Sequence, residues 1–214
     1  MTPFTPPQPL HVAITGNIGA GKTTLAQLLA DHYGWDVLDE AVAGNPYLAD
    51  FYADMPRWAF NLQIFFLNSR FTQIRIIQRA ERSVVQDRTI YEDAYIFAKN
   101  LHDTGKMSPR DYDTYRGLFE NMLSLVRPPD LIIYLCADLP KLSEQIRKRG
   151  RTYEQSISPD YLRSLNELYE NFARTYSAGE LLTINVNDLD YVNRPADLQY
   201  VIALVDKRIN GSPL

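Results

Sequence analysis

The sequence predicts an α/β protein whose parallel five-stranded sheet is covered by helices on both faces. Short β-rich runs alternate with longer segments of helical periodicity, and this alternation is typical of parallel strands joined by right-handed helical crossovers. The run 131–135 (LIIYL) reads as a buried strand, as such a sheet requires. The five expected strands are residues 10–14, 36–38, 83–86, 131–135 and 182–186.

The chain is expected to form a single domain over residues 10–214. Its 214 residues, of which 45% are hydrophobic, suffice for one sizeable core, and no repeat or internal linker divides them. Residues 1–9 contain four prolines. This composition favours a disordered or extended tail.

The expected helices differ in how their apolar residues are arranged. Residues 22–33 form a helix with leucines on one face that ends at Gly34. Residues 58–79 are apolar nearly all round, so this helix must be covered on several sides. Residues 110–125 form a suitable partner helix, and a helix-bundle homodimer would cover the remainder.

Composition excludes several classes of function. The formal net charge is −4 and no basic stretch is long enough to follow a nucleic-acid backbone, so no nucleic-acid partner is expected. No apolar run reaches the roughly 18–20 residues that span a bilayer, and the N-terminus lacks the pattern of a signal peptide. One cysteine, Cys136, cannot form an internal disulfide. These features indicate a cytoplasmic protein without a membrane partner.

Residues 16–23 (GNIGAGKT) fit the phosphate-binding pattern G-x-x-x-x-G-K-[ST] at every fixed position. Glycines let the backbone wrap around phosphates, and the following helix N-terminus adds its positive dipole end. Lys22 would hold the transferring phosphoryl group of ATP, and the Thr23 hydroxyl would ligate Mg²⁺. The expected ATP-binding residues of this P-loop are Gly16, Asn17, Ile18, Gly19, Ala20, Gly21, Lys22, Thr23 and Thr24.

Two charged groups follow expected strands and therefore face the ligand crevice of a parallel sheet. Glu40 comes two residues after the second strand, where a carboxylate can accept the proton of an attacking hydroxyl. Asp87 and Arg88 follow the strand 83–86. Asp87 can act on Mg²⁺, and Arg88 can stabilise charge on the transferred group and hold Glu40 ionised. A solvated loop acid and a surface ion pair are the alternative interpretations.

A basic segment, residues 147–151, is expected to form a lid. It contains Arg147, Arg149 and Arg151 after a helical stretch. Arginines on one mobile segment would neutralise the triphosphate and exclude water, which keeps a kinase from hydrolysing its donor. The alternative is a solvated helix end.

Taken together, these motifs resemble the deoxynucleoside kinase family, in particular its bacterial deoxyadenosine/deoxyguanosine kinase branch. The resemblance covers the chain from about residue 10 to the last helix. Besides the P-loop and Glu40, it rests on residues 45–52 (NPYLADFY), 58–63 (WAFNLQ), 87–93 (DRTIYED), the lid leading to 154–155 (EQ), and 185–188 (NVND). It implies a P-loop kinase fold with an arginine-rich lid, and transfer of the ATP γ-phosphate to the 5′-hydroxyl of a deoxynucleoside with Mg²⁺.

The resemblance also implies roles in catalysis and donor binding. Glu40 looks like the general base for the 5′-hydroxyl, and Arg88 like the arginine that contacts this base and the phosphate. Asp87 matches the acidic residue at magnesium. Asn187 and Asp188 fall in the loop that would hold the donor's adenine.

Further positions match residues that hold the acceptor. Tyr52 and Glu154 match the pair that hydrogen-bonds the sugar 3′-hydroxyl. Trp58 and Phe97 would pack around the base.

The residues expected to contact the base do not by themselves fix its identity. Gln63, with Arg70 and Asp93, matches the group that reads the base edge. A carboxamide can pair with adenine, cytosine or guanine because it can flip. An ionised Asp93 favours the amine of adenine or cytosine, whereas Arg70 favours guanine unless Asp93 already occupies it. Ala94 replaces an arginine found in some relatives and leaves space for a larger base. The family resemblance favours purines, with deoxyadenosine ahead of deoxyguanosine.

Three other functions compete with this interpretation. A deoxycytidine-accepting kinase is one alternative, because cytosine presents an amine beside a bare ring nitrogen, as adenine does. A nucleoside monophosphate kinase, such as a thymidylate kinase, shares the P-loop, the Asp-Arg pair and the lid, but Glu40 would repel its anionic acceptor. A non-catalytic assembly subunit would have no need of Lys22, Glu40 and Arg88, and all three are present.

Overall fold

A computed structural model describes residues 8–39, 44–151, 154 and 157–210. Two expectations fall wholly or partly outside these ranges. Glu40 is not among the described residues, and neither are residues 1–7 of the expected N-terminal tail. Within the described ranges, none of the helices is both long and apolar enough to cross a bilayer.

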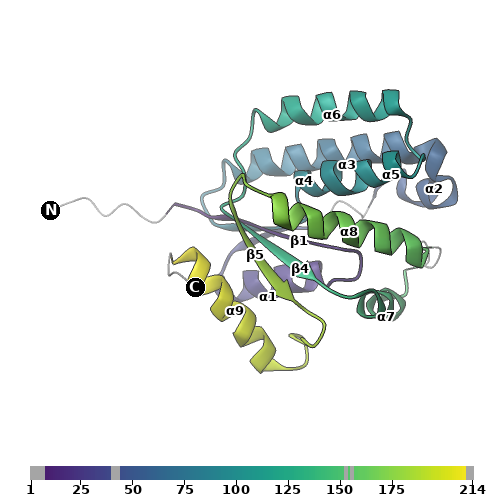
Figure 1. Cartoon of the computed structure of the whole chain (residues 1–214). Coiled ribbons are helices and arrows are strands. Elements are labelled where there is room, and N and C mark those ends of the chain that lie inside the picture. The colour runs from purple at the N-terminus through teal and green to yellow at the C-terminus, as the bar shows by residue number, and fades with distance from the viewer. Residues whose placement is uncertain (1–7, 40–43, 152–153, 155–156, 211–214) are drawn as a thin grey trace.

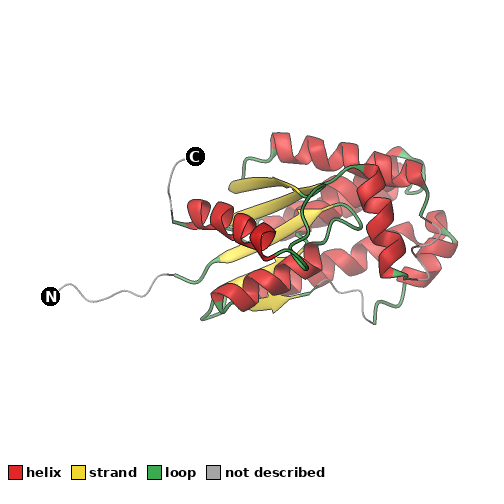
Figure 2. Cartoon of the chain, turned by 90° about the horizontal axis from the view of Figure 1, so that it is seen from below, coloured by secondary structure: helices red, strands yellow, loops and turns green. Residues whose placement is uncertain are grey.

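The five strands form one parallel sheet, as predicted (Figure 2). Its order is β2-β3-β1-β4-β5, so β1 lies at the centre with β3 and β4 beside it. The expected strand positions are confirmed to within two residues at either end. The strands are β1 (His11–Gly16), β2 (Asp36–Leu38), β3 (Val84–Asp87), β4 (Leu131–Cys136) and β5 (Glu180–Asn185).

Helices cover both faces of the sheet (Figure 1). On one face lie α1 (Lys22–Tyr33) and α9 (Pro195–Ile209). On the other lie α3 (Met55–Ile77), α6 (Pro109–Leu123) and α8 (Pro159–Thr175). Alternate residues of a strand point to opposite faces, and β1 follows this rule, because Val12 belongs to one core and Ala13 to the other.

The remaining helices are short and lie near the carboxyl ends of the strands or between α3 and α8. Both α2 and α7 lie at the same end of the molecule in Figure 1, and they flank the site described below. Their bounds are α2 (Leu48–Ala53), α4 (Ile90–Glu92), η1 (Asp93–Ala98), α5 (Lys99–Asp103) and α7 (Leu139–Arg149).

Local capping explains where helices α3 and α6 begin. Helix α3 starts three residues before the expected position, because the Asp54 side chain accepts a hydrogen bond from the backbone N–H of Arg57. Helix α6 likewise starts at Pro109, after Ser108, whose side chain accepts from the backbone N–H of Asp111. Proline is favoured in the first turn, where its missing N–H costs nothing.

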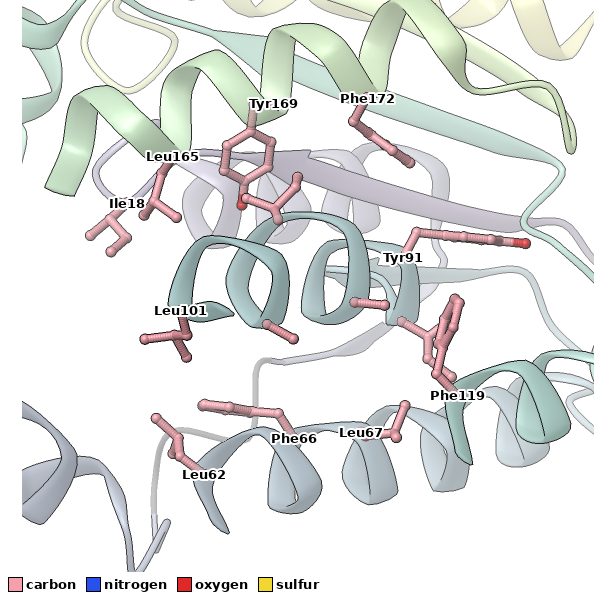
Figure 3. Packing of buried hydrophobic residues seen from close by; sticks show 14 of the residues in the cluster. Ile18, Leu62, Phe66, Leu67, Tyr91, Leu101, Phe119, Leu165, Tyr169 and Phe172 are labelled. Carbon is pink, nitrogen blue, oxygen red and sulfur yellow. The ribbon is translucent and has the colours of Figure 1, made fainter. Parts of the chain in front are cut away.

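Helix α3 is covered on several sides, as its apolar composition predicts. Figure 3 shows Leu62, Phe66 and Leu67 of α3 pointing toward the continuous helical run α4-η1-α5. Side chains of α8, among them Tyr169 and Phe172, reach the same run from the opposite side. The expected pairing of α6 with α3 is also confirmed.

The helical run between α3 and α8 contains a π-helical segment, η1, which the sequence analysis did not predict. It begins at Asp93, one of the expected base-reading residues, and Phe97 lies within it. A π-helical turn changes the direction in which successive side chains point and is frequent at functional sites. Here it contributes both of these side chains to the same cavity.

His11 at the start of β1 makes stability depend on pH. Burial lowers the pKa of its imidazole, and a hydrogen bond with Gln86 and the charge of Asp130 only partly offset this. The unfolded chain therefore binds a proton below about pH 6.5 while the folded chain does not. We expect the free energy of unfolding to fall as the pH drops through 6.5, by at most about 1.4 kcal/mol per pH unit from this residue.

Urea unfolding at pH 7.5, 6.5 and 5.5 checks this expectation when His11→Gln is compared with the wild type. The variant should lose stability less steeply over this range, because glutamine does not titrate. If the free energy of unfolding falls with decreasing pH equally steeply in the two proteins, His11 contributes nothing to the pH dependence.

Candidate active site

The P-loop connects β1 to α1, so its backbone and the first turn of α1 face the same space. Gly19 and Gly21 have φ angles of 87° and 91°, a region that only glycine occupies without strain. The Lys22 ammonium donates a hydrogen bond to the carbonyl oxygen of Asn17 (3.0 Å) and is 6% exposed. The lysine is therefore folded back over its own loop, where a phosphate would lie.

The Asp-Arg pair lies beside the P-loop because β3 is hydrogen-bonded to β1. Asp87 lies opposite Ile14 in the register, and the Arg88 N–H donates to the Ile14 carbonyl at 2.9 Å. The Thr23 hydroxyl donates to Asp87 Oδ2 at 2.5 Å. Asp87 is fully buried, and its Oδ1 has no hydrogen-bond partner among the described residues. A buried carboxylate oxygen of this kind beside a threonine hydroxyl suits a divalent cation.

Arg88 is the residue with the most unusual conformation in the site. Among the described residues other than glycine, it alone has a positive φ, 73°. Its guanidinium lies 3.5 Å from the Glu92 carboxylate, donates to the Tyr169 hydroxyl at 3.1 Å, and stacks over the Phe97 ring at 4.8 Å. Strained backbone persists only where surrounding contacts over-determine it, and these contacts do so.

Glu92 is the centre of this cluster. It is fully buried, accepts a hydrogen bond from Tyr169 (2.7 Å) and forms a capping box with Thr89 at the start of α4. The Glu92 carboxylate therefore has two roles: it neutralises Arg88 and it caps the start of α4. The Thr-x-x-Glu spacing is a known capping signal, so Glu92 could have been recognised as structurally important from the sequence.

A cavity of about 400 Å³ extends from the P-loop to the helices above the sheet. That volume matches a small-molecule site. Elements α1, α2, α3, η1, α7 and α8 all contribute to it. Its lining consists of Ile18, Gly19, Gly21, Lys22, Thr23, Thr24, Leu48, Phe51, Tyr52, Leu62, Gln63, Phe66, Arg88, Asp93, Phe97, Gln145, Lys148, Arg149, Arg151, Glu154 and Tyr161.

Two of the three expected base-reading residues line this cavity. Gln63 and Asp93 line it, whereas Arg70 is fully buried and does not. Arg70 Nε lies 3.6 Å from Asp93 Oδ2, and Arg70 Nη1 donates to Gln73 Oε1 at 3.1 Å. The oxygen of the Gln63 carboxamide is buried and has no hydrogen-bond partner among the described residues. A buried amide oxygen without a partner, on a residue that lines a cavity, indicates a polar ligand there.

Two of the three lid arginines, Arg149 and Arg151, line the same cavity. Arg149 pairs with Glu154 through two hydrogen bonds (2.6 and 3.0 Å), and Arg151 lies 3.4 Å from the same carboxylate. Arg147 is exposed and does not line the cavity, while its neighbour Lys148 does. Consecutive residues of a helix point to different sides. Arg147 and Lys148 are adjacent in the sequence, but only Lys148 therefore faces the cavity.

A second cavity, of about 380 Å³, lies on the other side of the P-loop. The loop after β5 forms one wall through Val186 and Leu189, among others, rather than through Asn187 and Asp188. The Asn187 side chain instead accepts a hydrogen bond from the backbone N–H of Asp138 at 2.8 Å, which anchors the loop.

Tyr191 links this loop to the P-loop. Its hydroxyl donates to the Gly21 carbonyl at 3.1 Å, and a Cβ added at Gly21 would lie 2.1 Å from the hydroxyl oxygen. Burial raises the pKa of Tyr191, so the hydroxyl stays protonated and can donate. No sequence motif marks this tyrosine, and its contact with a residue 170 positions earlier becomes visible only in the folded chain.

The structure thus brings most of the expected residues to one cavity and leaves a few elsewhere. Trp58 does not line it and packs against Tyr47 at a ring-centroid distance of 6.0 Å. Residues that were not anticipated as part of the site include Lys148, Glu92, Tyr169 and Tyr191. Of these, only Lys148 and Glu92 lie within segments that the sequence analysis had singled out.

A family model described as deoxynucleoside kinase matches residues 12–210. The chain belongs to the deoxynucleoside kinase family. The expected fold and the expected enzyme class are thereby confirmed. This kinase is 39% identical over 193 residues to a deoxyadenosine/deoxycytidine kinase of Bacillus subtilis, with 89% of each chain covered. It is 43% identical over 192 residues to a deoxyadenosine kinase of Dictyostelium discoideum, covering 90% of this chain and 77% of the relative.

Solved structures lead to the same family. The kinase superposes on the deoxyadenosine kinase of M. mycoides with bound products dCMP and dCDP, with a TM-score of 0.83, 28% identity, and coverage of 92% of this chain and 100% of that one. The same M. mycoides enzyme with bound dATP gives a TM-score of 0.81 at 28% identity, with coverage of 92% and 99%.

Proposed function

We propose that this kinase transfers the γ-phosphate of ATP to the 5′-hydroxyl of purine deoxynucleosides and prefers deoxyadenosine. The observation that carries this proposal is that Gln63 and Asp93 both line the main cavity, whereas Arg70, which lies 3.6 Å from Asp93, does not. This chain resembles relatives named as deoxyadenosine kinases and relatives named as deoxyguanosine kinases. The choice between adenine and guanine must therefore be argued from the residues that would contact the edge of the base.

The base preference follows from which groups the cavity presents. A carboxylate accepts hydrogen bonds and suits the exocyclic amine of adenine. Guanine would place its carbonyl oxygen against the same carboxylate unless an arginine intervened. Arg70 is committed to Asp93 and Gln73 and does not reach the cavity wall. Cytosine also carries an amine, so deoxycytidine is the second substrate that this wall accepts.

Catalysis is assigned to three charged residues. Glu40, which follows β2, accepts the proton of the 5′-hydroxyl as the oxygen attacks the γ-phosphorus. Lys22 and Arg88 stabilise the negative charge on the transferred phosphoryl group. Both cations line the main cavity, and Arg88 is held there by Glu92 before any substrate arrives. Such preorganised charge avoids reorganisation during the reaction.

Thr23 and Asp87 are the residues that would hold Mg²⁺. The Thr23 hydroxyl and the Asp87 carboxylate are hydrogen-bonded to each other, and Asp87 Oδ1 remains without a partner among the described residues. Magnesium there would neutralise charge on the donor phosphates.

The sugar and the triphosphate are assigned to α2 and to the lid. Tyr52 and Glu154 both line the cavity and would hydrogen-bond the 3′-hydroxyl. Glu154 already accepts from Arg149 and Arg151, so the group that would bind the sugar also orders the lid. Arg147 would join these two arginines at the phosphates only when the lid closes.

The two bases are assigned to opposite sides of the P-loop. Phe97 lines the acceptor cavity and would pack against the acceptor base, with Trp58 farther out beyond the lining. The donor adenine would lie in the second cavity, against the loop that contains Asn187 and Asp188. On this assignment the triphosphate bridges the two cavities across the P-loop.

The assay that tests this function measures ADP formation with Mg-ATP against deoxyadenosine, deoxyguanosine, deoxycytidine, thymidine and the corresponding monophosphates. We expect turnover of deoxyadenosine first, then deoxycytidine or deoxyguanosine, and none of the monophosphates. Turnover of monophosphates alone would contradict the proposal in favour of a nucleoside monophosphate kinase. No turnover at all would favour a non-catalytic subunit.

We also assign a homodimer and a cytoplasmic location. Ile76 on α3, Leu118 on α6 and Leu125 after it are 54%, 37% and 72% exposed, and α6 is the outermost helix on its side of the sheet (Figure 1). A second copy would bury these side chains. Sedimentation equilibrium should give twice the chain mass, and a monomer mass at all concentrations would contradict the assignment.

The cytoplasmic location is assigned from the single cysteine. Cys136 is free, as cysteines are in reducing compartments.

A further inference from the structure

The two cavities beside the P-loop share part of their walls. Five residues line both of them: Gly19, Gly21 and Thr24 of the P-loop and α1, and Gln145 and Lys148 of α7. We refer to these five residues as the seam, because the two cavities adjoin along them. A donor with its base in the second cavity and its γ-phosphate in the main cavity has to pass between the P-loop side and the α7 side of the seam.

Lys148 gives the seam its charge, because the other four residues are neutral. Gln145 and Lys148 lie three positions apart on α7, a spacing that places their side chains on one face of a helix. The P-loop lies on the opposite side of the seam, and the backbone N–H groups of such a loop bind anions. A polyphosphate between the two sides would therefore meet N–H donors on one side and an ammonium group on the other.

The charge of Lys148 is not offset by an ion pair within the described part of the chain. In this it differs from Arg149 and Arg151, which both contact the Glu154 carboxylate. Glu144 lies one helical turn before Lys148, and the described residues show no ion pair between these two side chains. The ammonium of Lys148 thus keeps its full charge for a ligand at the seam.

Acidic residues stand beyond the seam, on the side of the second cavity. Glu144 and Asp190 line that cavity but not the main one. Asp190 already accepts hydrogen bonds from the backbone and the side chain of Asn193. A neutral base can lie beside these carboxylates, whereas a polyanion would be repelled by them. The charges therefore favour a base in the second cavity and the phosphates at Lys148.

We infer that Lys148 binds the triphosphate of the donor where it crosses from the second cavity to the main cavity. Its ammonium donates hydrogen bonds to phosphate oxygens from the α7 side, opposite the P-loop. The inference rests on the proposed function, in which the triphosphate bridges the two cavities. The competing role is purely structural, because a cation in the last turn of a helix also stabilises the helix dipole.

The variant Lys148→Gln tests this contact, because it removes the charge and retains a polar side chain. We expect the KM for ATP to rise about tenfold, the factor that a hydrogen bond to a charged group contributes. The KM for deoxyadenosine should not change, because the contact is made to the donor. Inorganic tripolyphosphate should compete with ATP, and its Ki should rise by the same factor, since it carries the phosphates without a base.

Ionic strength supplies a readout that a structural role would not change. Raising the salt concentration from about 0.1 M to about 1 M shortens the Debye length from about 10 Å to about 3 Å and weakens contacts between exposed charges. The KM for ATP should therefore rise with salt more steeply in the wild type than in Lys148→Gln. Equal salt dependence in the two proteins would contradict a direct contact with the phosphates.

Two further variants serve as controls. Lys148→Arg keeps the positive charge and should retain most of the wild-type affinity for ATP. Lys207→Gln makes the same change in the last turn of α9, at an exposed lysine that lines neither cavity, and should leave the KM for ATP unchanged. Folding of each variant is checked by its thermal unfolding midpoint.

The outcomes separate this inference from the proposed function. An unchanged KM for ATP in a folded Lys148→Gln protein would overturn the inference, and so would an equal rise in Lys148→Arg. A rise for ATP without a rise in the Ki of tripolyphosphate would place the lysine at the base and would overturn it too. Calorimetric titration with ATP measures the contact without an acceptor. A wild-type protein that binds ATP but phosphorylates no deoxynucleoside would refute the proposed function alone.

Discussion

Replacing Arg88 by methionine is expected to lower kcat by at least about 10²–10³-fold, the usual effect of removing one preorganised charge donor from a transition state. The same change should destabilise the protein by about 3–5 kcal/mol, because it leaves the Glu92 carboxylate buried without its cation. Glu92 is fully buried and Arg88 is 6% exposed, so solvent cannot take over either role. Steady-state kinetics and urea unfolding measure the two effects.

A double variant separates catalysis from stability. In Arg88→Met with Glu92→Gln the uncompensated charge is gone, so most of the lost stability should return. The activity should remain at the level of the single variant, because the phosphoryl group still lacks its arginine. The single and the double variant both carry methionine at position 88, where φ is positive, so the backbone strain is the same in the two variants. Recovery of activity in the double variant would refute a direct role for Arg88.

Glu40→Gln is expected to lower kcat by about 10²–10⁴-fold, the range that general-base catalysis contributes. Glutamine retains the shape of the side chain but cannot accept the proton of the 5′-hydroxyl. The KM for the deoxynucleoside should change little, because the lost interaction acts mainly in the transition state.

Asp39→Asn is the matched control, because it neutralises the adjacent carboxylate in the chain. Asp39 is exposed, and its backbone carbonyl rather than its carboxylate receives the Gln73 hydrogen bond. Activity should therefore stay near the wild-type value. A large loss in Asp39→Asn with little loss in Glu40→Gln would mean that the general base has been misplaced by one residue.

Much of the fold was predictable because the relevant signals are local. The five strands, the helix 22–33 and the P-loop each depend on a few consecutive residues, and all were found close to their true positions. The errors at helix starts came from capping side chains such as Asp54 and Ser108, which extend a helix beyond its apolar pattern. The π-helical turn at Asp93 was missed because nothing in a short window distinguishes it from an α-helix.

The residue types needed for phosphoryl transfer could be read from the sequence, since a P-loop and charged groups after parallel strands converge in any sheet of this topology. The sequence could not show that Asp93 lines the cavity while Arg70 does not. That depends on contacts between distant residues: Arg70 contacts Asp93 and Gln73, and Gln73 accepts from Gln86. Gln86 in turn contacts His11, which lies 75 positions earlier in the chain. Hydrogen-bond direction is set by partners brought together only by packing β1, β3 and α3, so the tertiary structure decides which of the two charged side chains lines the cavity.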